Sequence, residues 1–189
     1  MKLPLLLAFV FVVAVGVAGA ADSKTSCVNK FLKFFSSFFA AGQVGGYADV
    51  AMTQVVAHAN SSKIVDAVID AVMNNLTSSQ YSQGSSLIVS AASKFGSYQA
   101  INETIQRCIS GAAPVLLKLY PKITTKIQAA SGQAAKMTAG YAYADKKFTQ
   151  KLCKKLVKKC KKKLTADQWS KGTSLLKNYI HFDQLGVQV

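Results

Sequence analysis

The sequence is poor in the residues on which most enzymes and tight phosphate sites depend. It holds one glutamate, two histidines and one arginine, Arg107. It also lacks the patterns H-E-x-x-H, G-x-S-x-G, G-x-G-x-x-G and G-x-x-x-x-G-K-[ST], which mark zinc peptidases, serine hydrolases and nucleotide sites. Asp66 and Asp70 lie four residues apart, but they fall opposite an apolar helical stripe, where solvated charges are expected. We therefore expect a non-enzymatic protein without a metal site, a catalytic residue or a cofactor.

Proline and glycine are also scarce, at 3 and 12 of 189 residues, whereas hydrophobic residues make up 50%. This composition excludes a collagen and a low-complexity linker, and it is far from that of a disordered chain. The length is that of a single compact domain, since a domain typically holds about 100–200 residues.

The chain has a single long apolar run, and it lies at the N-terminus. Lys2 precedes the uninterrupted apolar residues 5–15, and the small residues Ala18, Gly19 and Ala20 follow them. This order predicts a secretory signal peptide at residues 1–20 and a secreted, extracellular chain of residues 21–189. The run is shorter than the roughly 20 apolar residues of a membrane-spanning helix. No later run is long and uncharged enough either, so we expect no transmembrane segment.

Two further features agree with the secretory pathway. The triplets at Asn60, Asn75 and Asn102 have the form N-x-[ST], which is the acceptor pattern for N-glycosylation. The cysteines are even in number, which in a secreted chain of this size predicts two disulfides; they are Cys27, Cys108, Cys153 and Cys160. The chain is thus expected to be a disulfide-bonded glycoprotein.

The cysteine spacing restricts how these disulfides can pair. Cys153 and Cys160 lie seven residues apart, so on a continuous helix about 10 Å of rise separates their Cα atoms. A disulfide needs Cα atoms within about 7 Å. Cys27 and Cys108 would therefore each pair with one of the other two, in either combination. A zinc site is disfavoured, because the C-x6-C pair lacks the usual C-x2-4-C spacing.

The apolar residues recur at helical spacing along the mature chain. The clearest stripe runs from Ile64 to Leu76, at intervals of three and four residues. One further helix is expected from Ile123 to Met137, with boundaries or kinks at Pro114 and Pro121. No segment shows convincing strand alternation, and no fixed repeat emerges. The predicted fold is all-α: a single compact bundle of about seven or eight helices, stapled by two disulfides.

The positive charge is concentrated in one segment. The whole chain has 23 basic and 8 acidic residues, a net charge of +15, but residues 146–163 alone hold ten lysines and no acid. Without the signal peptide and this segment, the chain carries only +4. Apolar residues in the segment recur on one helical face, which predicts a lysine-rich helix at 146–164. The lysines are Lys146, Lys147, Lys151, Lys154, Lys155, Lys158, Lys159, Lys161, Lys162 and Lys163.

Such a lysine-rich face is either a solvated surface or a binding surface. Like charges at this density repel one another, which disfavours a purely solvated role. Lysine lacks the bidentate fork of arginine, so a diffuse anionic surface is a better partner than one phosphate group or a nucleic acid. Membrane disruption is disfavoured, because two cysteines on the apolar face indicate that this face is buried. The partner we expect is a membrane headgroup layer, an acidic polysaccharide or a mineral.

Two other functions remain open. Segments rich in small residues and in phenylalanine suit a self-associating structural component of an extracellular secretion, such as a silk, glue, cuticle or shell matrix. Phenylalanine clusters can also line a cavity, so a helical carrier of an apolar ligand is a third interpretation.

Overall fold

The computed structural model describes residues 21–35 and 38–189, and the predicted signal peptide at residues 1–20 lies outside this part of the chain. Its regular elements are helices, and the only β pairing among the described residues is one bridge between Phe35 and Ile180. The all-α prediction is therefore confirmed. In chain order, the helices are α2 (Ala21–Phe34), α3 (Ala41–Val56), α4 (Ser61–Asn74), α5 (Ser78–Phe95), α6 (Tyr98–Leu117), α7 (Tyr120–Gln128), α8 (Gln133–Lys147), α9 (Gln150–Lys161) and α10 (Ala166–Leu176).

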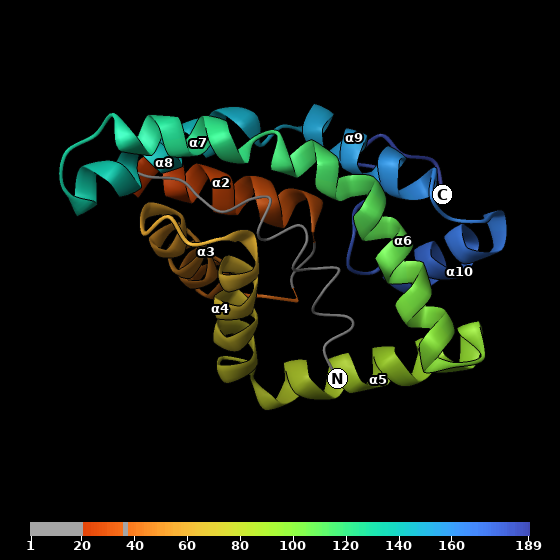
Figure 1. Ribbon diagram of the computed structural model, residues 1–189. Coiled ribbons are helices and arrows are strands. Elements are labelled where there is room, and N and C mark those ends of the chain that lie inside the picture. The colour runs from red at the N-terminus through yellow and green to blue at the C-terminus, as the bar shows by residue number, and fades with distance from the viewer. Residues whose placement is uncertain (1–20, 36–37) are drawn as a thin grey trace.

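The helices cross at steep angles and do not form a parallel bundle (Figure 1). Helices α2, α7 and α8 lie together along the upper side in that view, where α8 contacts both of the others. Helix α3 packs beside them, α4 packs against α3, and α5 runs along the opposite side. The long helix α6 connects the two sides and packs against α9, while α10 contacts α5.

The core gathers around the phenylalanines of α2 and Phe35, which follows this helix. Phe31, Phe34 and Phe35 are each at most 5% exposed, and the Phe34 ring lies 6.0 Å from that of Phe148 in an edge-on arrangement. Helix α4 contributes Ile64, Val68, Ile69 and Val72 to this core, while its Asp66 and Asp70 are exposed, as the apolar spacing predicts. Burying such side chains removes apolar surface from water at about 25 cal/mol per Å², which makes this cluster the main source of stability.

The structure departs from the predicted helix boundaries in two places. The segment from Ile123 to Met137 is two helices, because the chain turns at Gly132, whose φ of 82° favours glycine over any other residue. Pro114 lies in the last turn of α6 and does not end that helix, whereas Pro121 stands in the first turn of α7, where its missing N–H costs little.

An ion pair fastens α2 to α8 and makes stability depend on pH. Lys30 Nζ lies 2.7 Å from Asp145 Oδ1 and also donates to the Asp145 carbonyl oxygen at 3.1 Å. Burial opposes ionisation of Asp145, but hydrogen bonds from Lys30, Ser26 and Cys27 outweigh it and hold the pKa of this carboxyl below its usual range. The ion pair therefore stabilises the fold above the pKa of an unfolded aspartate, near 4, and the gain is lost as the pH falls through the lower folded pKa.

Replacing Asp145 by asparagine is expected to remove this part of the pH dependence. At pH 7 the loss should be about 1 kcal/mol, since the pair is only partly buried, and at pH 2 the variant and the wild type should be nearly equal. Urea unfolding at both pH values measures the difference. Asp70→Asn is the control, because Asp70 is exposed on α4 and makes no ion pair with any described residue. An equal loss at both pH values would contradict the prediction.

Candidate anion-binding surface

Helix α9 presents one apolar and one basic side. Thr149 begins the helix: its Oγ1 accepts a hydrogen bond from the backbone N–H of Leu152 at 3.2 Å. Cys153, Leu156 and Val157 are at most 4% exposed and face the core. The amphipathic pattern predicted from the sequence is therefore present, with its apolar side covered by protein.

The lysine-rich segment does not form one helix over 146–164, however. Lys146 and Lys147 close α8, and α9 runs only from Gln150 to Lys161. The chain leaves the helical conformation at Phe148, where ψ is 93° and the ring is buried beside Phe34. Burial of this ring in the core requires the turn, which a helical period read from the sequence alone does not show.

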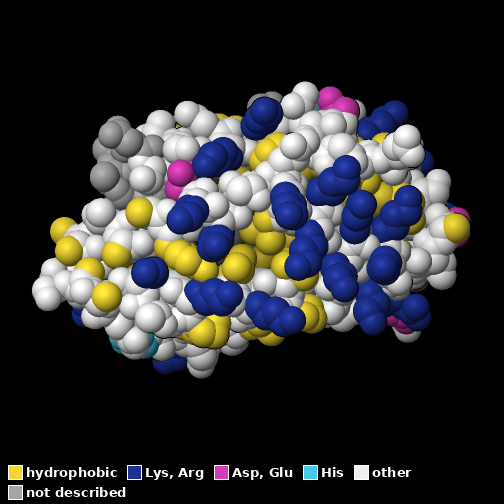
Figure 2. Space-filling view, turned by 90° about the horizontal axis from the view of Figure 1, so that it is seen from above, with side chains coloured by type: hydrophobic (Ala, Val, Ile, Leu, Met, Phe, Trp, Pro, Cys, Tyr) yellow, Lys and Arg dark blue, Asp and Glu magenta, His cyan; other side chains and the backbone are white. Residues whose placement is uncertain are grey.

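The structure brings all ten lysines to the surface, and we call this set the lysine surface. Nine of them are exposed, and Lys154 is half-buried. None of the ten makes an ion pair with a described carboxylate; Lys147 and Lys161 instead lie 5.6 Å and 5.0 Å from the ring centres of Tyr143 and Trp169. Figure 2 shows lysine and arginine side chains crowded over one part of the upper face, with apolar atoms exposed between them.

Further cations, which the sequence reasoning missed, extend the basic region. Helix α6 packs on α9, and α7 lies beside α8 on the same upper side of Figure 1. These two helices and their junction carry further exposed basic side chains, namely Arg107, Lys118, Lys122 and Lys126. They are scattered over 20 residues of sequence, so no charge run reveals them, and only the packing of α6 and α7 brings them to this region.

The structure contains one disulfide among the four cysteines, where two were predicted. Cys108 of α6 is bonded to Cys160 of α9, which agrees with the prediction that Cys160 pairs with another helix and not with Cys153. The prediction of a second disulfide is wrong, because the remaining two cysteines, Cys27 and Cys153, are not bonded to each other. Cys27 faces α8, where its thiol donates a hydrogen bond to Asp145, whereas Cys153 is buried on the inner side of α9. Burial raises the pKa of Cys153 to about 12, so its reactive thiolate is nearly absent at neutral pH.

The three predicted glycosylation sites are all on the surface. Asn60 caps α4 through a hydrogen bond that its Oδ1 accepts from the backbone N–H of Lys63. Asn75 ends the same helix, and its Nδ2 donates to the carbonyl oxygen of Ala71 at 2.7 Å. Asn102 is exposed in the first turns of α6. All three asparagines are exposed, and a glycan on Asn75 would replace one of the two N–H groups of the nitrogen that donates to Ala71.

Two other kinds of feature are absent from the described ranges. No group of three or more histidine, cysteine or acidic side chains among residues 21–35 and 38–189 could hold a metal ion. Over the same part of the chain, no helix has the length and apolar character needed to cross a membrane.

Comparison with known proteins identifies a family but no individual relative. No curated protein matches the chain significantly, and neither does any solved structure. One family model, described as "Uncharacterized protein B0228.1-like", matches residues 5–175 and so covers most of the sequence, including helices α2 to α9 and nearly all of α10. The chain therefore belongs to the uncharacterized B0228.1-like family.

Proposed function

We propose that this is a secreted, non-enzymatic protein that binds an anionic surface through its lysine surface. The observation that carries the proposal is that ten lysines within 18 residues make no ion pair with a described carboxylate, and nine of them are exposed. The secreted location rests on the N-terminal sequence pattern and the three acceptor asparagines.

The arrangement of the lysines also supports a partner. Within α9, Lys151 and Lys155, Lys154 and Lys158, and Lys155 and Lys159 are like-charged neighbours four residues apart. Such pairs destabilise a helix by about 0.2–0.5 kcal/mol each. A bound anionic layer would attract these lysines and offset their mutual repulsion. Binding therefore accounts for a cluster that destabilises the isolated protein.

The cations suit an extended partner better than a single small anion. They project from α9, from the end of α8 and from the turn after α9 over a broad, exposed area. A lysine ammonium is a compact point charge with no fixed direction, so it responds to a charge field and not to one phosphate geometry. Apolar atoms lie exposed between lysine and arginine side chains on the face in Figure 2, which favours a phospholipid headgroup layer over a sulfated polysaccharide or a mineral.

The test is a charge-neutralising variant in which Lys151, Lys155, Lys158, Lys159 and Lys162 are all replaced by glutamine. Each lysine near an anionic bilayer contributes about 1 kcal/mol, so loss of five is expected to weaken binding to phosphatidylserine vesicles by several thousandfold, about 5 kcal/mol. Binding of the wild type should also fall steeply as salt is raised. Vesicle co-sedimentation at several salt concentrations measures both effects.

A control variant with the same net charge separates a local surface from general basicity. It replaces five lysines on other helices or at their ends by glutamine: Lys33, Lys63, Lys94, Lys136 and Lys177. This variant should retain most of the binding. Equal losses in the two variants, or none in either, would contradict the proposal. Retention on heparin but not on vesicles would identify the partner as an acidic polysaccharide instead of a lipid layer. Self-assembly without any added anion, detected by light scattering, would favour the self-associating matrix component.

A further inference from the structure

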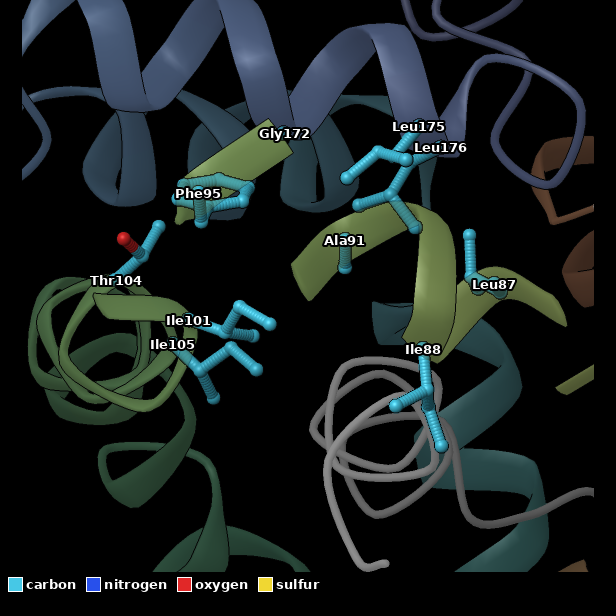
Figure 3. A pocket seen from close by; sticks show the side chains of 10 residues that line it. All are labelled: Leu87, Ile88, Ala91, Phe95, Ile101, Thr104, Ile105, Gly172, Leu175 and Leu176. Atoms are coloured by element: carbon cyan, nitrogen blue, oxygen red, sulfur yellow. The ribbon is translucent and has the colours of Figure 1, made fainter. Parts of the chain in front are cut away.

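A narrow apolar hollow lies between α5, α6 and α10, away from the lysine surface. Figure 3 shows side chains from all three helices pointing into it. The hollow has a volume of about 70 Å³, and about 540 Å³ of atom-free space is present when its open mouth is included. The lining residues are Leu87, Ile88, Ala91, Phe95, Ile101, Thr104, Ile105, Gly172, Leu175 and Leu176.

The hollow offers no hydrogen-bonding group to an occupant. Thr104 is its one residue with a polar side chain, and the Thr104 hydroxyl already donates to the carbonyl oxygen of Ala100 at 2.8 Å. Figure 3 shows this oxygen turned away from the hollow. A water molecule is not stabilised in the hollow, because a buried water needs two to four polar partners. Only hydrocarbon fits the chemistry of the walls.

Gly172 keeps this space open at a cost to its own helix. It lies inside α10, where glycine is about 0.8–1 kcal/mol less favourable than alanine. A Cβ atom added there would meet nothing within 4 Å, whereas one added at Gly111 or Gly140 would collide with a neighbouring helix. No packing contact therefore requires glycine at position 172, and a side chain there would occupy the hollow.

A cation stands at the edge of the hollow. Lys171 precedes Gly172 in α10, and its Nζ lies 5.9 Å from the ring centre of Phe95, which is a lining residue. The same Nζ is 2.8 Å from Asp167, a mostly exposed carboxylate that an incoming anion can displace. An alkyl chain in the hollow would place an anionic head within reach of this lysine.

We propose that the hollow binds the alkyl chain of a single-chain anionic amphiphile, such as a long-chain fatty-acid anion, with Lys171 at its head. The site goes beyond the proposed function, because none of the ten lysines of the lysine surface lines it. Helix α5 fits this role: it buries only Gln80 fully, and its apolar residues Leu87, Ile88, Ala91 and Phe95 face the hollow.

The test uses the delipidated full chain and cis-parinaric acid, a fatty acid that fluoresces when its chain enters an apolar site. Gly172→Leu fills the hollow and should weaken binding at least tenfold, while the leucine, a better helix former, should leave the fold intact. Gly46→Leu is the matched control, since a Cβ at Gly46 on α3 also meets nothing within 4 Å and Gly46 lies outside the lining set. This control should bind as the wild type does.

A second variant tests the head of the ligand. Lys171→Gln should weaken binding of the fatty acid but not of the uncharged fatty alcohol with the same chain, because only the former presents an anion. The variant with five lysines of the lysine surface replaced by glutamine should keep its fatty-acid binding, so that failure of one proposal does not imply failure of the other. No binding by the wild type, or equal affinity in wild type and Gly172→Leu, would overturn the inference.

Discussion

Removal of the Cys108–Cys160 disulfide is expected to lower the free energy of unfolding by about 4 kcal/mol. The bond closes a loop with a sequence separation of 52 residues, and the loop-entropy account of disulfides gives about that value for a loop of this length. It is also the only covalent link between α6 and α9 apart from the chain itself. Since a domain of this size is stable by about 5–15 kcal/mol in all, much of its stability is at stake.

The measurement is urea unfolding of the double variant Cys108→Ser, Cys160→Ser beside the wild type, each with and without a reductant. The wild type should lose stability when reduced, and the double variant should be indifferent to the reductant. After denaturation without reduction, an alkylating reagent should modify two thiols, Cys27 and Cys153. A wild type that is equally stable with and without the reductant would refute the prediction. If neither thiol is alkylated, the protein contains a second disulfide, as the sequence predicts.

The second large effect concerns Gly111, at the contact between the same two helices. An alanine Cβ at this position would lie 2.3 Å from the carbonyl oxygen of Lys159 and 2.9 Å from Lys163 Cγ. The oxygen belongs to the backbone of α9, so it cannot move aside as a flexible side chain does. Overpacking of this kind costs about 1–3 kcal/mol or more, which exceeds the gain of up to about 1 kcal/mol from replacing glycine within a helix.

Gly111→Ala is therefore expected to destabilise the protein by about 2 kcal/mol, and a larger residue by more. The control is Gly84→Ala in α5, where an added Cβ meets nothing within 4 Å, so that only the gain in helix propensity remains. In thermal or urea unfolding, Gly111→Ala should be less stable than the wild type and Gly84→Ala should be more stable. If both variants stabilise the protein, α6 and α9 do not approach as closely as described here.

Features that depend on local spacing could be predicted from the sequence. The stripe that buries Ile64 and Val68 follows from intervals of three and four residues. The capping box of Thr165 and Gln168, visible as a pattern of two residues, is present with both hydrogen bonds at 3.1 Å. The exposed lysines of α9 are likewise a consequence of its amphipathic period. In each case the physical cause lies within a few residues of its effect.

Features that depend on which helices meet could not be predicted. The sequence does not distinguish Gly111 from other glycines until α9 is placed against α6. The hollow likewise forms only when residues 172–176 of α10 pack against residues 87–105, which are distant in the sequence. The number of cysteines predicted two disulfides, but Cys27 on α2 faces Asp145 on α8. An even number of cysteines constrains their pairing only after the direction of each side chain is known.

The disulfide also determines what a protease could release from the lysine surface. Enzymes that cut after lysine would find many exposed targets between Lys146 and Lys159. Every such cut falls between Cys108 and Cys160, so both pieces remain joined by the S–S bond. A nick there would therefore not shed the basic segment as a free peptide. The two fragments would migrate as one molecule under oxidising conditions and would separate only once the bond is reduced.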